Sequence, residues 1–538
     1  MMSFSIRGRH IPMRKNSFLT SNVNCRKMLP LVIALVALCA AGNLPAQSKP
    51  ANSATAQDAR IQKIEAQVLD IPMGEKEPLR LSLAQAMQAY NVPGLSVAVI
   101  DHYKIAWAKG YGVIGTGSTT PVGTGTLFQA GSISKPVAAT AALALVQQGK
   151  LSLDEDVNQK LKTWKVPENE FTKDQKVTLR RLMSHTAGLT VHGFPGYDVD
   201  APLPTVVQVL NGEKPANTDP IRVDIVPGTK DRYSGGGVTI EQLLMIDVTG
   251  KSFPVLLRET VLDKIGMSAS SYDQPLPAAR AALTANGTYA DGKPVHGRWH
   301  IYPEMAAAGL WTTPTDLAKF AIEIAQSKNG KSNKVLTQKT VEEMLTPVLP
   351  HGPGLGFFVE EQNPGVFGHN GADEGFQALL TMNWQTGNGV AIMADSDNGI
   401  AVADLLLRSV AKEYSWNYKA EMLHPLVLIA KLRGAQAALD RYTELKKSGA
   451  IDAETGEREL NQVGYTLLYG GHEQDAITVF QRNVEDYPQS WNSYDSLGEA
   501  YMKTGQKDLA IKNYEKSLEL NPKNENGDEM LKKLREMK

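Results

Sequence analysis

Residues 130–136 read Ala-Gly-Ser-Ile-Ser-Lys-Pro, and an alanine-rich run with helical periodicity, 137–148, follows them directly. Proline is tolerated only in the first turn of a helix, where its missing N–H has no helical partner. Pro136 therefore predicts that Ser132 lies at the very start of a helix. A residue three positions further on shares the same helix face, so Lys135 can bring its amine beside the Ser132 hydroxyl.

This placement favours nucleophilic chemistry at Ser132. A lysine in a poorly solvated site can be the base that activates a serine. The free N–H groups at a helix amino terminus favour negative charge, and the Ser132 backbone N–H can supply half of an oxyanion hole. The alternative is an ordinary helix cap, which needs only the serine and gives no reason for Lys135.

Ser-x-x-Lys is a short pattern, and about two chance matches are expected in a chain of this length. The second match, Ser409-Val-Ala-Lys412, lies inside the apolar periodic run 400–414, where a serine in mid-helix is ordinarily structural. The local context therefore favours Ser132 as the nucleophile. The nucleophile-elbow pattern Gly-x-Ser-x-Gly does not occur in the sequence, which argues against an α/β-hydrolase.

Two further motifs follow in the chain: Tyr233-Ser-Gly235, after Pro227-Gly228, and His369-Asn-Gly371. The order Ser-x-x-Lys, Tyr-Ser-x, His-x-Gly resembles that of the penicillin-recognising serine hydrolases. The chain is similar to their class C β-lactamase and D-peptidase branch over residues 60–415, and the stretches 182–189, 265–267 and 307–318 fit as well.

This resemblance implies roles for several residues. Ser132 would be acylated, and Lys135 and Tyr233 would share the proton transfer. The strand that carries His369, Asn370 and Gly371 would form the other wall of the substrate site, and the Ala372 N–H would complete the oxyanion hole with the Ser132 N–H. The sequence indicates no metal and no cofactor: the metal-like spacing His296-x3-His300 lies among Gly and Pro and has no carboxylate between its histidines.

Two departures from the family pattern bear on the substrate. Gly235 stands where many relatives have an asparagine that binds the substrate amide, and His369 stands where β-lactamases have a lysine. Histidine is mostly neutral near pH 7, so it holds a carboxylate less firmly than an ammonium does. Both departures favour an esterase, or a peptidase or amidase acting on small D-amino-acid compounds. The alternatives are a β-lactamase, a peptidoglycan D-Ala-D-Ala carboxypeptidase, and a catalytically silent binding protein.

The hydrophobic pattern predicts the architecture of this region. Strand patterns occur near both of its ends, at 95–100, 104–108, 355–360, 376–383 and 389–394, and helical patterns dominate between them. We therefore expect an α+β, β-lactamase/transpeptidase-like domain over 58–415, whose antiparallel sheet is formed by both ends and is joined to a helical half. Helix-spaced apolar residues at 61–69 and 79–89 predict two helices before the first strand.

The carboxyl end contains an internal repeat. A spacing of 34 residues aligns Gly464 with Gly498 and Pro488 with Pro522, which is the tetratricopeptide pattern of paired helices. We expect an all-α repeat domain over 458–538, after a helical connector over 416–457, and a protein partner or self-association through its concave surface. Two repeats are fewer than independent stability usually requires, so the tail should pack on the connector or on the hydrolase domain.

The amino terminus has the three parts of a secretory signal. The basic pair Arg26-Lys27 precedes fourteen mostly apolar residues, 28–41, and small residues lead to Ala46. A helix of that length would span ~21 Å, which is short of the ~30 Å hydrocarbon layer of a membrane. We therefore expect a cleaved signal over 1–46, a linker over 47–57, a periplasmic or secreted protein, and no stable membrane span after cleavage.

Composition excludes several other classes of function. The chain is 42% hydrophobic and 21% charged with a net charge of −1, and six basic residues with no acid lie in the first 46, so the remainder is mildly acidic. That balance offers no footprint for nucleic acid. The two cysteines, Cys25 and Cys39, lie in the expected signal. A mature chain would therefore lack disulfides, thiolate nucleophiles and cysteine-ligated metals.

Overall fold

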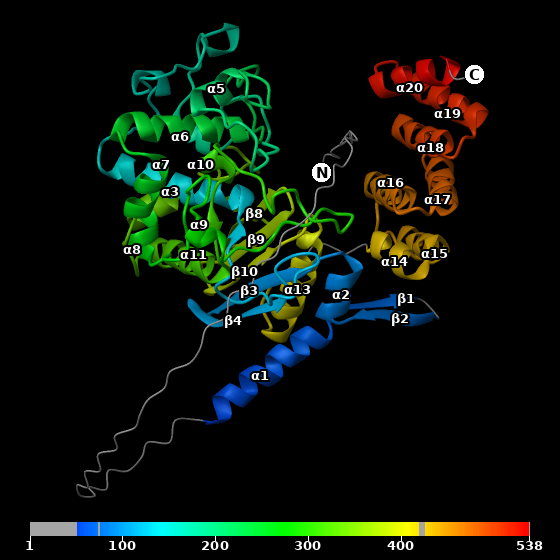
Figure 1. The fold of residues 1–538 in the computed structure, drawn as a ribbon, viewed down its shortest axis with the longest axis horizontal. Coiled ribbons are helices and arrows are strands. Elements are labelled where there is room, and N and C mark those ends of the chain that lie inside the picture. The colour runs from blue at the N-terminus through cyan, green and yellow to red at the C-terminus, as the bar shows by residue number, and fades with distance from the viewer. Residues whose placement is uncertain (1–50, 74–75, 419–424, 537–538) are drawn as a thin grey trace, which may run out of the picture. The chain divides into compact units, whose positions relative to one another are not determined.

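The computed structural model describes residues 51–73, 76–418 and 425–536 (Figure 1). The expected signal peptide, 1–46, lies outside this described part. In the described ranges, no helix combines the length and the apolar character that a membrane span requires.

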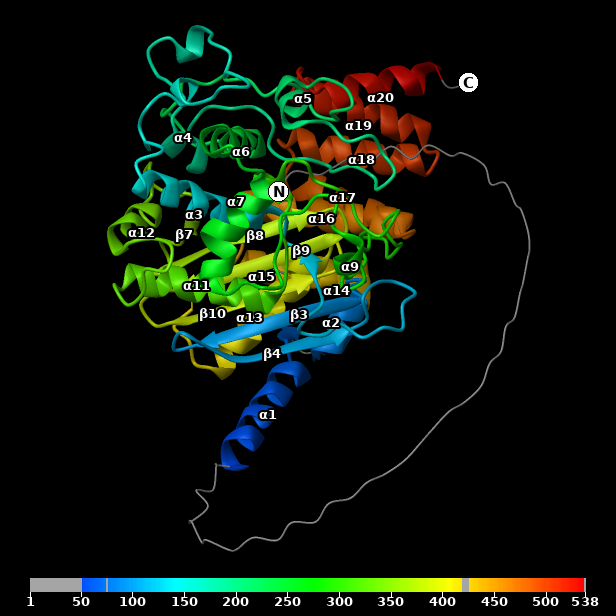
Figure 2. The same cartoon turned by 60° about the vertical axis from the view of Figure 1, so that its left-hand side comes forward.

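A six-stranded antiparallel sheet forms the centre of the larger domain, in the order β4-β3-β10-β9-β8-β7. Its strands are β3 (Gly94–Asp101), β4 (Lys104–Gly112), β7 (Phe358–Val359), β8 (Val366–Asp373), β9 (Phe376–Asn383) and β10 (Asn388–Ala394). Val97 of β3 lies opposite Ile392 of β10, so strands from both ends of the domain meet at the middle of the sheet (Figure 2). This confirms the predicted α+β arrangement.

The central strands β3 and β10 are buried on both faces, which is why β3 is apolar along most of its length. Ala98 and Ile100 belong to the core beneath the helical half, whereas Val97 and Val99 belong to a second core on the opposite face. Helix α11 (Pro314–Lys328) packs on the inner face against β3, β9 and β10, and α13 (Gly399–Glu413) packs on the outer face against β9 and β10.

The helical half lies between β4 and β7 in the chain and surrounds α3, whose residues are buried over most of its length. Its other helices are α4 (Leu179–Met183), α5 (Val206–Asn211), α6 (Gly235–Thr249), α7 (Phe253–Leu257), α8 (Asp263–Ile265), α9 (Ala278–Ala281), α10 (Met305–Ala308) and α12 (Gln338–Met344), with α3 spanning Ser134–Gln147. A two-stranded sheet of β5 (Phe128–Gln129) and β6 (Trp311–Thr312) lies beside them.

The segment before β3 contains both expected helices and a hairpin that was not predicted. The helix expected over 61–69 is the end of α1 (Ala51–Ala66), which begins inside the expected linker. The helix expected over 79–89 is α2 (Leu83–Ala89), which begins later than predicted, after Ser82, and Ser82 forms a capping box with Gln85. Between the two helices, β1 (Leu69–Met73) pairs with β2 (Lys76–Leu81), and burial in 69–73 alternates residue by residue, which is the period of a strand.

The tail is entirely helical, and two of its helix pairs, α16–α17 and α18–α19, correspond to the two predicted repeats. Its helices are α14 (Leu426–Arg433), α15 (Ala435–Lys447), α16 (Ala453–Tyr469), α17 (Glu473–Asp486), α18 (Trp491–Lys503), α19 (Lys507–Leu520) and α20 (Glu525–Glu536). The domain boundary expected between 457 and 458 falls within α16, so the first repeat begins earlier than predicted.

The repeat helices pack on the connector helices α14 and α15, and these connector helices pack on the larger domain. Helix α14 contacts both α2 and α16, and its buried residues belong to the same core as the outer face of the sheet. An ion pair at 2.9 Å joins Lys76 Nζ of β2 to Asp440 Oδ2 of α15. The continuous core explains how so short a repeat array is stabilised.

Candidate active site

Ser132 and Lys135 meet at the start of α3. Ser132 lies in a short 3-10 turn, Gly131–Ile133, that leads directly into this helix, where Pro136 predicts it. The Lys135 Nζ donates hydrogen bonds to Ser132 Oγ and to the Ala307 carbonyl oxygen, each at 2.8 Å. The Lys135 side chain is buried, so these two acceptors hold its amine beside the hydroxyl.

The Ala307 carbonyl is itself held by α6. Gln242 of α6 is fully buried; its Nε2 donates to the Pro303 carbonyl at 3.0 Å, and its Oε1 accepts from the Ala306 N–H at 2.8 Å. These bonds fix the start of α10, whose Ala307 carbonyl receives the Lys135 hydrogen bond. Gln242 is thus a supporting residue that the sequence analysis did not identify.

Tyr233 lies beside the same ammonium. The Lys135 Nζ is 5.0 Å from the centroid of the Tyr233 ring. Ser234, the next residue, caps α6 by accepting the Gly237 N–H at 3.0 Å. Four other rings surround Tyr233, at centroid distances of 4.3 Å (His185), 4.9 Å (His192), 6.2 Å (His369) and 6.3 Å (Phe358). An aromatic cluster therefore encloses the phenol.

His185 positions the turn that carries Tyr233. Its Nδ1 accepts from the Ser234 N–H at 3.2 Å, and its carbonyl accepts from the Arg232 N–H at 2.8 Å. Burial, with a smaller effect of the Lys135 charge, keeps the His185 pKa well below its ordinary value. His185 also ends α4: its φ is +58°, and its N–H donates to the Leu182 carbonyl at 3.3 Å. The sequence signal that could have identified His185 as a site residue is the stretch 182–189, which fits the family pattern.

Strand β8 brings its backbone against the serine turn at two glycines. A Cβ atom at Gly371 would lie 1.9 Å from the Ala130 carbonyl oxygen and 3.2 Å from the Ser132 nitrogen. A Cβ atom at Gly131, where φ is +50°, would lie 2.4 Å from the Ala372 nitrogen. Only glycine permits this approach of the two backbones. The approach brings the strand segment with the Ala372 N–H next to the turn segment with the Ser132 N–H.

The remaining predicted residues differ in their orientation. His369 lies on the same face of β8 as Gly371, and its side chain is buried, whereas Asn370 is exposed on the opposite face. The Asn370 side chain therefore does not join the others. Gly235 begins α6 and donates its N–H to the His192 carbonyl at 2.9 Å. A Cβ atom at Gly235 would lie 3.1 Å from that oxygen, so an asparagine would be crowded here.

Three buried titratable groups surround Lys135. Burial, reinforced by the Lys135 charge, lowers the His369 pKa to about 3. Burial raises the Glu241 pKa to about 8 and the Asp373 pKa well above its ordinary range, although the Lys135 charge opposes both shifts. His369 is therefore neutral near pH 7, and the Asp373 carboxyl favours its protonated form. Glu241 and Asp373 were not identified from the sequence, because only the tertiary structure brings them near Lys135.

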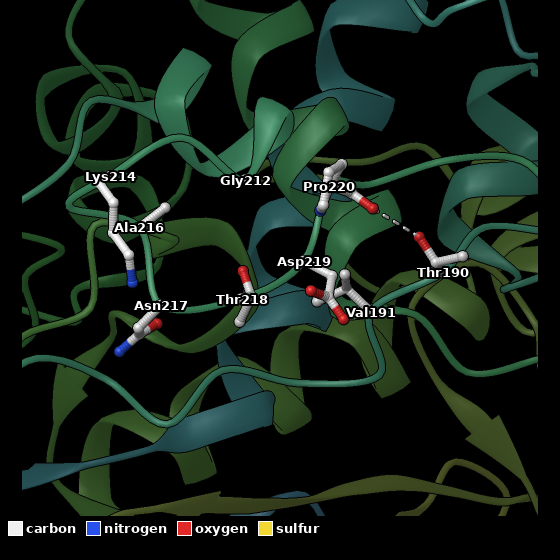
Figure 3. A pocket seen from close by; sticks show the side chains of 9 residues that line it. All are labelled: Thr190, Val191, Gly212, Lys214, Ala216, Asn217, Thr218, Asp219 and Pro220. Atoms are coloured by element: carbon white, nitrogen blue, oxygen red, sulfur yellow. Dashed lines mark hydrogen bonds between the residues drawn. The ribbon is translucent and has the colours of Figure 1, made fainter.

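A pocket of about 610 Å³, whose lining residues are drawn in Figure 3, lies next to the Tyr233 turn. It shares Thr190 and Val191 with that turn, since Ser234 Oγ donates to the Thr190 carbonyl at 2.7 Å and the Gly236 N–H to the Val191 carbonyl at 3.1 Å. Ser132 does not line it. The pocket is lined by Thr190, Val191, Gly212, Lys214, Ala216, Asn217, Thr218, Asp219 and Pro220.

Two other sequence patterns suggested chemistry: the second Ser-x-x-Lys match at Ser409 and the metal-like histidine spacing. Ser409 lies within α13, and its hydroxyl donates to the carbonyls of Ile64 at 3.3 Å and Gln67 at 3.2 Å. It therefore ties α13 to the segment of α1, as expected of a structural serine. In the part of the chain that the structure describes, no group of three or more His, Cys, Asp or Glu side chains is arranged to hold a metal ion.

A serine bonded to a lysine one turn later, beside a tyrosine and a His-x-Gly strand, defines the class of penicillin-recognising serine hydrolase folds. The family model described as Beta-lactamase matches residues 79–414, and the chain belongs to this family. A second model, Tetratricopeptide repeat, matches residues 496–524. Both matches confirm the resemblance and the domain type predicted from the motifs.

Individual relatives agree with this assignment. The chain is 30% identical over 237 residues to a protein named Beta-lactamase from Pseudomonas fluorescens, covering 44% of this chain and 60% of that protein. It is 26% identical over 336 residues to Penicillin-binding protein 4 from Amycolatopsis lactamdurans, covering 58% of this chain and 83% of that protein. The chain spans about three-fifths of the length of the first curated relatives it matches.

Among solved structures, the fold is similar to the octameric penicillin-binding protein homologue from Pyrococcus abyssi. The TM-score is 0.51 at 22% sequence identity, and the match covers 62% of this chain and 76% of that chain. A second structure, SurE with D-Leu, matches with a TM-score of 0.50 at 20% identity, over 68% of this chain and 78% of that chain. These likenesses concern the fold.

Proposed function

We propose that this protein is a serine hydrolase that works through an acyl-enzyme on Ser132 and cleaves esters or the peptide or amide bonds of D-amino-acid compounds. One observation carries the proposal. The Lys135 amine bonds the Ser132 hydroxyl at 2.8 Å at the start of α3, and the same amine lies 5.0 Å from the Tyr233 ring. The serine thus has a lysine beside it, and a tyrosine lies beside that lysine, so two groups near the site can move a proton.

In the acylation step, Ser132 Oγ attacks the substrate carbonyl carbon and forms a C–O bond. The hydroxyl proton passes to the base formed by Lys135 and Tyr233, and the electron pair of the carbonyl moves onto its oxygen. The N–H groups of Ser132 and Ala372 donate to this oxyanion. When the carbonyl re-forms, the bond to the leaving group breaks and the leaving group takes the proton.

In the deacylation step, a water molecule replaces the leaving group. The same base takes a proton from the water as its oxygen attacks the acyl carbon. The ester bond to Ser132 then breaks, and the proton returns to Ser132 Oγ as the acid departs. Gln242 and His185 support both steps, because one fixes the Ala307 carbonyl that holds Lys135 and the other fixes the turn that carries Tyr233.

Covalent labelling tests this proposal. Folded protein is treated with a fluorophosphonate, and the adduct is located by peptide mass spectrometry. We expect one adduct, on Ser132, and none in the Ser132→Ala variant. The matched control is Ser409→Ala, which removes the serine of the second Ser-x-x-Lys pattern and should label at the wild-type rate. Folded protein that carries no adduct on Ser132 would contradict the proposal.

A second candidate function, binding a protein partner or a second copy through the tail, is favoured by the tetratricopeptide match and by the exposure of an aromatic side chain, Tyr469, at 66%. If the protein acts only by binding, Ser132→Ala restores a null mutant as fully as the wild type does. If hydrolysis is needed, Ser132→Ala fails and Tyr469→Ala shows whether the tail contributes as well.

We also propose that the chain is exported, on the basis of the signal pattern over 1–46. Expression of the full chain followed by amino-terminal sequencing should yield a mature protein that begins at Gln47. A chain that retains residues 1–46 would contradict cleavage.

A further inference from the structure

His369 presents a hydrogen-bond acceptor to the nucleophile's side of β8. Its Nδ1 lies 2.5 Å from the Asn370 carbonyl oxygen. A carbonyl oxygen can only accept, so Nδ1 carries the ring hydrogen of the neutral imidazole and Nε2 keeps its lone pair. Nε2 is buried and has no hydrogen-bond partner within the described residues.

The surroundings place the His369 ring beside the substrate site. His369 shares its strand face with Gly371, whose backbone abuts the Ser132 nitrogen. The His369 ring is 5.1 Å from the Phe358 ring and 6.2 Å from the Tyr233 ring, and the side chain is only 6% exposed. A buried acceptor without a partner is costly, and a substrate that supplies a donor removes that cost.

A second buried group without a cationic partner lies on the other side of Gly371. Asp373 shares the same strand face and is 6% exposed; in the described part of the chain no side chain bonds its carboxyl oxygens, and the Gly131 backbone N–H lowers its pKa. Of the described residues whose charges act most strongly on His369 and Asp373, the one cation is Lys135, which already bonds Ser132. The other charges acting on Asp373 are the carboxylates of Glu374 and Glu304.

We infer that the site selects substrates that carry a hydrogen-bond donor, such as an amide or an amine, beside the scissile carbonyl, and that it discriminates against a free carboxylate there. His369 is the specificity-determining residue, because its Nε2 accepts from that donor. This inference rests on the proposed acyl transfer at Ser132 and names its substrate class. A carboxylate in the same position would face the Nε2 lone pair and would lose water without gaining a cation.

The test uses two esters that differ at one group. N-acetyl-D-alanyl-D-lactate ends in a carboxylate, and its D-lactamide counterpart ends in a carboxamide, while the scissile ester is the same. We expect the wild type to prefer the carboxamide by about tenfold in kcat/KM, which is the scale expected when a buried polar group is matched in one ligand and unmatched in the other. His369→Lys, which supplies an ammonium, should reverse the preference.

His369→Gln is the second variant, and it guards against misfolding of His369→Lys. Its amide can turn either its oxygen or its NH₂ toward the ligand, so we expect the preference to shrink to about twofold. Each ester is also scored as a competitor that slows fluorophosphonate labelling, so that preference is measured even where turnover is slow. Equal competition, or stronger competition by the carboxylate, overturns the inference.

The labelling reaction separates the two levels of failure. If Ser132 is labelled and the wild type prefers the carboxylate, the substrate inference fails while the proposed hydrolase function stands. If folded wild type is not labelled at Ser132, the proposed function fails, and the substrate inference fails with it.

Discussion

Replacing Gly371 by alanine should separate the strand from the serine turn. The new Cβ atom would lie 1.9 Å from the Ala130 carbonyl oxygen, whereas a carbon and an oxygen in contact are normally about 3.3 Å apart. The two backbones must therefore move apart by about 1.4 Å, unless neighbouring atoms relax to share the displacement. Strand β8 cannot yield freely, because Gly371 is paired with Ala378 of β9.

Two losses follow from this displacement. Overpacking of a close backbone contact should lower the free energy of unfolding by about 1–3 kcal/mol. A shift of ~1 Å between the Ser132 and Ala372 N–H groups should slow acylation by about 100-fold, since misplacement on that scale removes catalysis of this size. At 1.36 kcal/mol for each factor of ten, the activation free energy rises by roughly 2.7 kcal/mol.

The assay measures the rate constant of fluorophosphonate labelling per folded molecule, together with the melting temperature. The control is Gly389→Ala in β10, where a Cβ atom would lie 2.5 Å from the Thr381 carbonyl, two strands away from β8. Both variants should melt at lower temperature, but only Gly371→Ala should label slowly. Equal labelling rates in the folded fractions would refute the reasoning that the close approach of β8 builds the oxyanion site.

Three further outcomes are expected. Burial raises the Glu241 pKa to about 8, so the contribution of Glu241 to stability is complete below pH 4.5 and is lost as the pH rises through 8. Glu241→Gln should therefore reduce the change in unfolding free energy between pH 5 and 8 by on the order of 2 kcal/mol. Urea titrations in which the wild type and the variant have parallel pH profiles would contradict this. Gln242→Met removes both hydrogen bonds that fix α10, so we expect the free energy of unfolding to fall by about 2 kcal/mol and Ser132 to be labelled more slowly. An unchanged labelling rate in the folded protein would contradict this. Ile429 of α14 is fully buried, so Ile429→Ala should lower the free energy of unfolding by about 2–5 kcal/mol. The whole molecule should still unfold in one calorimetric transition, at a lower temperature. A separate transition for the tail, or a folded 458–538 fragment after proteolysis, would argue against the shared core.

The proximity of Ser132 and Lys135 is predictable from the sequence because both lie within one helical turn, where spacing alone determines which side chains meet. Four strands of the central sheet, β3, β4, β9 and β10, are predictable because they have clear apolar runs and turn signals. Strand β8 has no such run and was expected only from the family resemblance, and the strand expected over 355–360 is reduced to β7 (Phe358–Val359). The short strands β1 and β2 were missed, because their alternating pattern covers only a few residues and helical patterns flank it.

The rest of the site depends on contacts that spacing does not encode. Tyr233 and His369 lie far from Ser132 in the chain, and their roles came from a family resemblance. Gln242, Glu241 and Asp373 carry no motif, and their importance follows from the burial and hydrogen bonds that tertiary packing creates around Lys135. Asn370 lies within a motif but does not join the site, because the motif alone does not show which face of the strand its side chain occupies.

The pairing of β3 with β10 also has a consequence for biosynthesis. Val97 pairs with Ile392, which is synthesised about 300 residues later, so the middle of the sheet can form only after that point. Contacts of such long range fold slowly, because a large loop must close before they contribute. Ser132 is made early, but β8 and the strands that support it emerge near the end of the domain. A nascent chain that has not passed residue 394 therefore has a serine and a lysine in place but no finished site, so any reactivity at Ser132 should appear only after translation of the domain is complete.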